Sequence, residues 1–219
     1  MIATRDRVLA AAGALFAERG FHGTTVRDIA ARAGANVAAG HYHYGSKKAL
    51  YLAVLRAEFA RIRAVLRARG ASLQPEELAR LSRRDLVALL RARLTVMLEL
   101  LIGPPPGLHA TLMHREMCDP SEALPVIVEE FIAPLMRETR EIAAHLLPGV
   151  DGRAVQRCAF SVVGQALFYR FTMPAVLELL GLESYPPRLS RELAAHLATF
   201  SLGGMDAVAA GRRRSRRAR

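Results

Sequence analysis

The 219-residue sequence has little of what most sites of covalent or redox chemistry need. Its two cysteines, Cys118 and Cys158, follow no metal-binding or disulfide-exchange spacing. We therefore expect both to be reduced, mostly buried thiols of a cytosolic protein. A phosphate-binding glycine loop, a paired-carboxylate motif and an activated nucleophile are also missing, which argues against an enzyme and against a cofactor.

Patterns of membrane insertion, secretion and β-structure are missing as well. No run of about 18 apolar residues occurs, and the start MIATRDRVLAAAG lacks the basic-then-apolar pattern of a leader. No segment alternates apolar and polar residues with the period of a strand. These absences predict a cytoplasmic, all-α protein with no membrane partner.

Acidic residues are scarce at the N-terminal end. Residues 1–70 carry 12 basic and 4 acidic side chains, whereas residues 71–211 carry 13 basic and 16 acidic ones. The last eight residues, RRRSRRAR, add six arginines. This distribution favours a polyanion-binding N-terminal segment attached to a nearly neutral body with another role.

Helical periodicity and turn residues organise the N-terminal segment. Gly20 is suited to end a first helix in the left-handed conformation. Thr25 and Asp28 form a capping box for the second helix, Gly34 makes a turn, and Asn36 caps a third helix. The predicted helices cover about residues 4–19 and 25–32, a segment that begins after Asn36, and residues 47–69.

The second and third of these helices have the layout of a helix-turn-helix, whose second helix enters the major groove of DNA. Ala38 and Ala39 are small enough for the backbone to approach the duplex closely. His and Asn side chains offer hydrogen bonds to base edges, and Tyr42 and Lys47 suit phosphate oxygens. The residues predicted to contact DNA are Thr25, Arg27, Asn36, Val37, Ala38, Ala39, His41, Tyr42, His43 and Lys47.

The rest of the chain is also predicted to be helical. The segment Gly103-Pro104-Pro105-Pro106-Gly107 ends a helix, because proline lacks an amide donor, and Pro134 should kink a later one. The predicted helices cover about residues 75–102, 107–118, 121–146, 151–171, 174–181 and 188–202. The predicted organisation is a three-helix DNA-binding domain (1–47), a connecting helix (48–70), a helical ligand-binding and dimerisation domain (71–203) and a disordered basic tail (204–219).

At this point the sequence resembles a family. Residues 5–55 look like the N-terminal domain of TetR-type transcriptional repressors, through LFAERGF, TTVRDIA, the Ala-Gly turn, Tyr42-His43-Tyr44 and Ser46-Lys47. The run AGANVAA followed by YHYGSK is most similar to the CecR-like branch. Residues 115–140 and the run GQALFYRF look like the C-terminal domain of that branch.

The resemblance implies a homodimer that binds a palindromic DNA operator and a small-molecule effector in the C-terminal domain. Residues 155–171 are apolar on nearly every face, so a monomer could bury them centrally, but residues 189–200 are strongly apolar as well. The resemblance implies instead that they pair with their copies as a four-helix interface. The interface residues predicted on this basis are Val155, Ala159, Val162, Val163, Ala166, Leu193, Leu197 and Phe200.

Three polar residues in apolar surroundings are candidates for an effector pocket. Arg115 and Glu116 either face solvent, satisfy each other, or meet a polar group of a ligand. The amide of Gln165 needs a partner from the pocket, a ligand or the second subunit. The predicted pocket residues are Met113, Arg115, Glu116, Phe131, Gln165 and Tyr169.

Other functions stay open beside a ligand-responsive repressor. His109, His114, Glu116 and Cys118 could hold a metal, but ordinary helix packing accounts for them, so no metal is predicted. An all-α carrier or enzyme for a hydrophobic metabolite would also need a large apolar body. A DNA-binding protein without sequence preference would need only the basic segment.

Overall fold

The computed structural model describes residues 4–36, 44–103 and 107–217, with side chains to residue 211. Within these ranges the chain is helical and contains no β-strand, so the predicted all-α class is confirmed. The helices are α1 (Thr4–Arg19), α2 (Val26–Ala33), α4 (Lys47–Ala68), α5 (Pro75–Leu78), α6 (Arg83–Ile102), α7 (Leu108–Cys118), α8 (Leu124–Ile127), the π-helix η1 (Val128–Ile132), α9 (Ala133–Leu146), α10 (Gly152–Phe171), α11 (Met173–Leu180) and α12 (Pro187–Arg217).

Contacts divide the chain into two compact units, which are described separately. The first unit comprises Met1–Ile62 and Gly107–Ile132, and the second comprises Arg63–Pro106 and Ala133–Arg219. The units are interleaved along the chain, whereas the predicted boundaries at residues 47 and 70 follow sequence order. α4 begins in the first unit and ends in the second, and the segment of α7, α8 and η1 joins the N-terminal helices.

The first unit is held by an apolar stripe along α1. Val8, Leu15 and Phe16 recur at helical spacing and are buried, as are Ile29 of α2 and Leu50 of α4. Burying a side chain of this size stabilises a fold by about 1.5–3 kcal/mol. This packing fixes α2 against α1, and α2 is the first half of the predicted helix-turn-helix.

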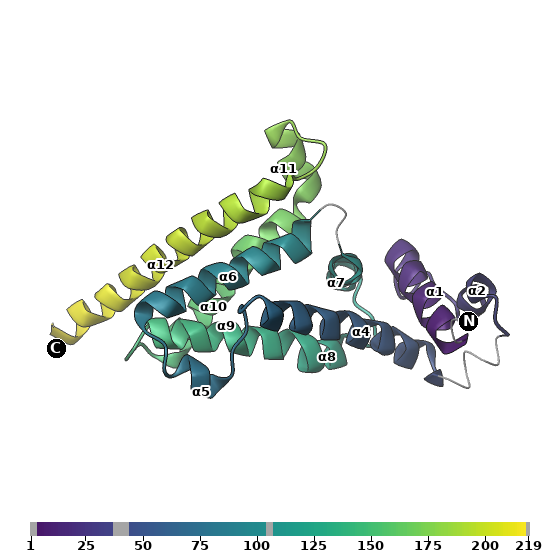
Figure 1. Ribbon diagram of the computed structural model, residues 1–219, viewed down its shortest axis with the longest axis horizontal. Helices are drawn as coiled ribbons and strands as arrows, with labels where there is room; N and C mark the ends of the chain where they lie inside the picture. The colour runs from purple at the N-terminus through teal and green to yellow at the C-terminus, as the bar shows by residue number, and fades with distance from the viewer. Residues whose placement is uncertain (1–3, 37–43, 104–106, 218–219) are drawn as a thin grey trace. The chain divides into compact units, whose positions relative to one another are not determined.

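The second unit has a core of aliphatic side chains. Leu90, Leu94 and Leu98 of α6 are completely buried, and their cluster includes Val162 of α10 and Leu197 of α12. α12 runs alongside α6, and α10 contacts α6, α9 and α12 (Figure 1). α6 is therefore the central helix of this unit.

Two helix boundaries in the second unit differ from the prediction. The helix predicted over 75–102 is divided, because Ser82 accepts a hydrogen bond from the amide of Asp85 and starts α6 afresh. The helix predicted to end near residue 202 continues to Arg217, so the predicted disordered tail is helical to that residue. Met205 is buried in the core cluster, and this packing carries the helix past Gly203 and Gly204.

Pro134 was predicted to kink its helix, and the structure places a π-helical turn directly before the helix that contains it. α8, η1 and α9 form one continuous helical segment in which the π-turn immediately precedes α9. Proline at the second position of α9 supplies no amide donor and crowds the preceding turn. The wider π-helical turn accommodates this disturbance, as π-bulges commonly do.

The expectation of buried cysteines is wrong. Cys118 is exposed at the end of α7, and Cys158 is half-buried on α10. Cys118 lies in the last turn of α7, where few later residues cover it. Partial burial raises the pKa of the Cys158 thiol, which keeps it in the neutral form.

Candidate nucleic-acid interface

The turn between α1 and α2 is built from backbone carbonyls that two side chains hold together. Gly20 takes the left-handed conformation, with φ of 74°, and ends α1. The buried hydroxyl of Thr24 donates to the carbonyl oxygens of Gly20 (2.8 Å) and Leu15 (3.2 Å). The Lys47 ammonium donates to the carbonyl oxygens of Phe21 (2.9 Å) and Thr24 (3.1 Å). The side chains of Thr24 and Lys47 therefore both hold the turn that leads into α2.

Lys47 was predicted to contact phosphate, but most of its hydrogen-bonding capacity is used within the first unit. Besides the two carbonyls, its nitrogen lies 4.2 Å from the centroid of the Phe21 ring, a cation–π distance. An ammonium has three donor hydrogens, so one is left for another partner. Lys47 thus orients the start of α2 and α4, whatever contact it makes with DNA.

The predicted capping box at the start of α2 is confirmed. The Thr25 hydroxyl accepts from the amide of Asp28 (3.1 Å), and the Asp28 carboxylate accepts from the amide of Thr25 (3.1 Å). The hydrogen bond from Thr25 and nearby arginines hold the pKa of Asp28 below its usual range. Thr25 and Arg27 are exposed beside the positive end of the α2 dipole, where an anion is favoured.

The central part of the predicted recognition helix lies outside the described residues. Val37, Ala38, Ala39, His41, Tyr42 and His43 belong to it, so their predicted contacts stay predictions. Its two flanks are described. Gly34 makes the left-handed turn after α2, with φ of 59°, and Asn36 is exposed. Tyr44, on the other flank, donates to the carbonyl oxygen of Arg5 (3.4 Å).

α7 is tied to the C-terminal end of α1. The Arg115 guanidinium donates to the carbonyl oxygens of Ala17 and Glu18 through Nε and Nη2, both at 2.5 Å. These are among the carbonyls that have no partner within the helix itself, so the cation both satisfies them and complements the helix dipole. The ring of His22 also bonds to the carbonyl oxygen of Pro120 (3.3 Å). Arg115 therefore behaves as a C-terminal cap of α1.

Glu116 is the centre of a buried hydrogen-bond network in the first unit. Its side chain is only 2% exposed. One carboxylate oxygen accepts from the Tyr51 hydroxyl of α4 (3.0 Å), and the other accepts from the amide and hydroxyl of Ser121 (2.9 Å each). Burial and the carboxylate raise the pKa of Tyr51. Tyr51 in turn packs against Phe16 and Phe21 of the α1 end.

The six residues predicted to line an effector pocket are divided between the units. Met113, Arg115, Glu116 and Phe131 lie in the first unit, where Phe131 stacks on Phe59 with centroids 4.6 Å apart. Gln165 and Tyr169 lie in the second. The Gln165 amide donates to the carbonyl of Ser161 and the hydroxyl of Ser201, both at 3.1 Å. The polar groups of Arg115, Glu116 and Gln165 thus already have partners within the chain.

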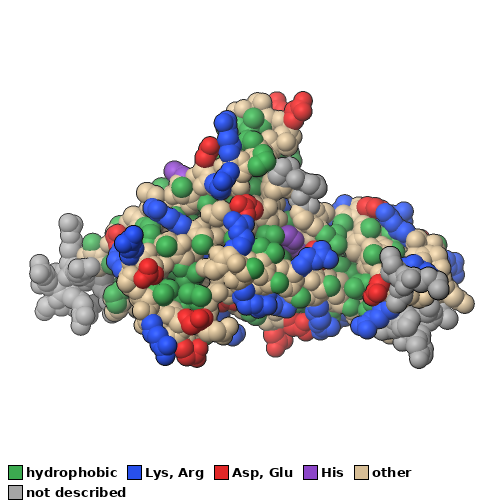
Figure 2. All heavy atoms as spheres, viewed as in Figure 1, with side chains coloured by type: hydrophobic (Ala, Val, Ile, Leu, Met, Phe, Trp, Pro, Cys, Tyr) green, Lys and Arg blue, Asp and Glu red, His purple; other side chains and the backbone are tan. Residues whose placement is uncertain are grey.

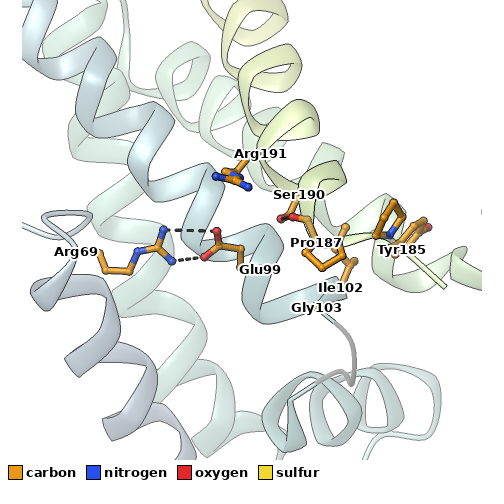
Figure 3. Close-up of a pocket in the computed structure, with 9 residues that line it drawn as sticks. Arg69, Glu99, Ile102, Gly103, Tyr185, Pro187, Ser190 and Arg191 are labelled. Carbon is orange, nitrogen blue, oxygen red and sulfur yellow. Dashed lines mark hydrogen bonds and ion pairs between the residues drawn. The ribbon is translucent and has the colours of Figure 1, made fainter.

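A cleft of about 330 Å³ is present in the second unit, and none of the six predicted pocket residues lines it. Its walls come from the residue after α4, the end of α6 and the first turns of α12 (Figure 3). This cleft could not be predicted from the sequence, because its lining residues, such as Arg69 and Arg191, are far apart in the chain. Arginine is also so frequent in this sequence that the presence of Arg69 and Arg191 does not by itself indicate a binding site.

Most residues predicted for the dimer interface face the core of their own chain. Val155, Ala159, Val162, Ala166 and Leu197 are at most 4% exposed, so they have almost no surface to offer a partner. Phe200 differs, because it is 65% exposed. The other large apolar side chains exposed on these two helices are Phe160 (57%), Phe168 (53%) and Val208 (39%). Most of the predicted interface residues therefore pack inside the single chain, whereas Phe200 belongs to the exposed apolar surface of α10 and α12.

α12 stands out for its apolar surface. Figure 2 shows hydrophobic side chains at the surface of the second unit, interspersed with arginines. By length and composition alone, the stretch Pro187–Gly211 could cross a membrane, and it is the one such helix among the residues described. The stretch contains Arg188, Arg191, Glu192 and Asp206, so it is not a continuous apolar run. Only 28% of its most apolar window is buried in the single chain.

A buried arginine was not anticipated from the sequence. Arg93 of α6 is 6% exposed, and its guanidinium donates to the Glu138 carboxylate (2.7 Å), the Thr139 hydroxyl (3.1 Å) and the carbonyl of Ala71 (3.1 Å). These groups come from two separate segments, the chain that follows α4 and α9. Arg93 therefore fixes the chain that follows α4 against α6 and α9.

The candidate metal ligands do not converge. Among the described residues, no three His, Cys, Asp or Glu side chains are placed to share an ion. His114 and Cys118 approach to 3.8 Å, whereas the neighbouring Glu116 carboxylate binds Tyr51 and Ser121.

Comparisons with known proteins agree with this architecture. Residues 8–54 match the model for bacterial regulatory proteins of the tetR family. Residues 82–205 match the C-terminal domain of the HTH-type transcriptional dual regulator CecR. The curated CecR protein of Shigella flexneri is 30% identical over 184 residues, which cover 79% of this chain and 78% of that protein.

Solved structures of similar fold are regulators as well. A TetR-like transcriptional regulator from Rhodococcus sp. RHA1 superposes with a TM-score of 0.66 at 22% identity, over 93% of this chain and 98% of that one. A TetR-family regulator from Streptomyces coelicolor gives 0.64 at 20% identity, over 92% of this chain and 95% of that one. At these identities the likeness shows the fold.

Proposed function

Because the chain belongs to the TetR family of transcriptional regulators, in its CecR-like branch, we propose that it is a ligand-responsive repressor that binds a palindromic operator as a homodimer. The family consists of DNA-binding regulators of the bacterial cytoplasm, and its members are not enzymes. The repressor role, the palindrome, the dimer and the effector are the parts that we propose.

The observation that carries the proposal is the fixed entry to the helix-turn-helix. Thr24 and Lys47 fix the turn before α2, and the capping box orients its first residues. Thr25 and Arg27 are then exposed where flanking phosphates would lie, and Asn36 at the start of the recognition helix is exposed for base contact. A rigid base of this kind favours readout of a defined DNA sequence.

The dimer is supported by the exposed apolar face of α10 and α12. Three phenylalanines more than half exposed are unusual on a monomeric protein, and aromatic side chains are typical of interface centres. A two-fold pairing through Phe160, Phe168 and Phe200 would bury them. Two recognition helices held in this way would read half-sites one duplex turn apart, about 34–36 Å, or a multiple of it.

Regulation is supported by the ties between α7 and the DNA-binding helices. Arg115 and Glu116 connect α7 to the end of α1 and to α4, and Arg56 of α4 makes a bidentate ion pair with Glu130 of η1. A ligand that displaced this segment would displace both helices. It must bind one arrangement more tightly than the other, because equal affinity shifts no population.

The direct test is selection of bound sequences from a random DNA pool with the purified full-length chain. We expect an inverted repeat, bound at least about a thousandfold more tightly than scrambled duplex at physiological salt. Equal competition by scrambled DNA would favour a binder without sequence preference. Failure to bind any duplex would favour the carrier or enzyme for a hydrophobic metabolite.

The relative from Shigella flexneri is named a dual regulator, so the direction of control needs its own measurement. Transcription in vitro from the selected promoter should fall when the protein is added. An increase at the same promoter would replace repression by activation and leave the DNA-binding assignment intact.

A further inference from the structure

The cleft in the second unit has the composition of a site for a small organic anion. It has a volume of about 330 Å³, at the lower end of the range for small-molecule pockets. Ile102, Tyr185 and Pro187 give it apolar walls, while Arg69, Glu99 and Arg191 supply the charges. The charged groups are partly or largely exposed and stand beside this apolar surface.

The charged groups of the cleft leave cationic capacity unused. Arg69 forms an ion pair with Glu99, which takes up two of its nitrogens. Arg191 extends from α12 toward this pair in Figure 3 and has no ion-pair partner among the described side chains. Two guanidinium groups facing one carboxylate leave a net charge of +1, which suits a single negative charge.

The remaining polar groups of the cleft are committed to the protein. The Ser190 hydroxyl donates to the carbonyl of Pro187 (3.0 Å), and the Tyr185 hydroxyl donates to the carbonyl of Tyr169 (3.1 Å). A neutral polar ligand would therefore find few partners here. A carboxylate, in contrast, is matched by the planar fork of arginine.

We propose that this cleft binds a small monocarboxylate with an apolar body, its carboxylate held by Arg191 and Arg69 and its body against Ile102, Tyr185 and Pro187. The inference rests on the proposed regulatory function, because it names the chemical class of the effector. An arriving carboxylate competes with Glu99 for Arg69. Arg69 follows directly after α4, the helix that starts in the DNA-binding unit, so occupancy alters the end of that helix.

The test uses two carboxylates, benzoate and hexanoate, and their neutral amides, benzamide and hexanamide, titrated into the full-length protein by calorimetry. We expect the carboxylates to bind and the amides to bind at least about tenfold more weakly, because hydrogen bonds to charged groups are the stronger ones. Arg191→Gln should weaken carboxylate binding by a similar factor of about ten.

Arg188→Gln is the matched control. Arg188 is also an exposed arginine in the first turn of α12, but it does not line the cleft. The variant removes the same charge from the same helix end and should bind benzoate as the unchanged protein does. Both substituted residues are exposed, so equal thermal melting midpoints will establish that the two variants are folded alike.

The possible results distinguish failure of the proposed cleft from failure of the proposed regulatory function. Carboxylate binding that needs Arg191 supports the site, and a shift of operator affinity by the same ligand supports the effector class. No heat with any carboxylate, or equal weakening by both substitutions, overturns the cleft while operator binding still tests the regulator. Binding of inorganic phosphate as tightly as benzoate would overturn the organic class, since phosphate has no apolar body.

Discussion

The two units differ in the balance between internal hydrogen bonds and exposed apolar surface, although Arg93 makes a buried hydrogen-bond network in the second unit as well. In the first unit, Lys47, Arg115 and Glu116 form hydrogen bonds with groups of the same chain. Each of them joins segments that are distant in sequence. In the second, aliphatic side chains form the core, and the phenylalanines of α10 and α12 are left exposed. Precise internal hydrogen bonding fixes one arrangement of helices, whereas exposed apolar area is stabilised only by association.

This difference predicts that the first unit responds more strongly to loss of single hydrogen bonds, and that the second unit, outside the Arg93 network, responds more strongly to loss of packing or of a partner. The hydrogen-bond ties of the first unit are directional, so removing one partner leaves a buried group unsatisfied. Apolar contacts are non-directional and scale with area.

The largest effects on stability and on dimerisation are expected from two positions of α12, Leu197 and Phe200. Leu197→Ala should lower the free energy of unfolding by about 4 kcal/mol, because it opens a cavity in the core of the chain itself. Phe200→Glu should instead raise the dimer dissociation constant at least about a hundredfold, because it places a charge in the proposed interface centre. Chemical denaturation and sedimentation equilibrium measure the two quantities.

A third variant controls for the effect of the introduced charge itself. Met117→Glu introduces the same charge at an exposed apolar residue of the first unit and should leave association unchanged. Dissociation by Leu197→Ala alone, with Phe200→Glu still dimeric, would mean that the proposed interface is on the wrong face.

The next effect concerns the buried carboxylate of the first unit. Glu116→Ala leaves the Tyr51 hydroxyl and both Ser121 donors without their acceptor, so the free energy of unfolding should fall by about 3 kcal/mol. Urea denaturation measures it. Glu122→Ala, at an exposed glutamate of the following loop, should change it by less than about 0.5 kcal/mol. Similar losses in both variants would contradict the role given to the network.

Local signals made the N-terminal helices predictable from sequence. The capping box of Thr25 and Asp28 and the glycines at the ends of α1 and α2 act over a few residues, so the sequence alone carries them. The fit of Glu116 to Tyr51 could not be predicted in this way, because the two residues are 65 positions apart. A buried carboxylate is visible in a sequence, but its partner is not.

The faces of α10 and α12 illustrate a second limit. Residues 155–171 are apolar on nearly every side and residues 189–200 are strongly apolar, so the sequence pattern alone did not identify which apolar side chains stay exposed. The structure assigns Val162 and Leu197 to the core and leaves Phe160 and Phe200 outside. The end of α12 was misplaced for a related reason, since Gly203 and Gly204 are helix-weakening locally while burial of Met205 outweighs them.

A smaller effect distinguishes the internal role of Lys47 from a simple phosphate contact. Lys47→Ala removes two hydrogen bonds to turn carbonyls and the contact with the Phe21 ring, and should lower the free energy of unfolding by about 2 kcal/mol. Lys48→Ala removes the same charge one residue later and should not. If Lys47→Ala weakened operator binding with no loss of stability, Lys47 would act on phosphate alone.

The smallest effect lies at the capping box. The pKa of Asp28 is lowered chiefly by its hydrogen bonds with Thr25, so the ionised carboxylate stabilises α2 above the unfolded-state pKa, and this contribution is lost as pH falls through the folded-state value. Thr25→Ala should raise the pKa of Asp28 toward its ordinary value and cost about 1 kcal/mol of stability. Carboxyl resonances followed by NMR during an acid titration report the pKa directly. An unchanged pKa in Thr25→Ala would assign the shift to the neighbouring arginines, and the rigid start of α2 would then owe less to its cap than to packing against α1.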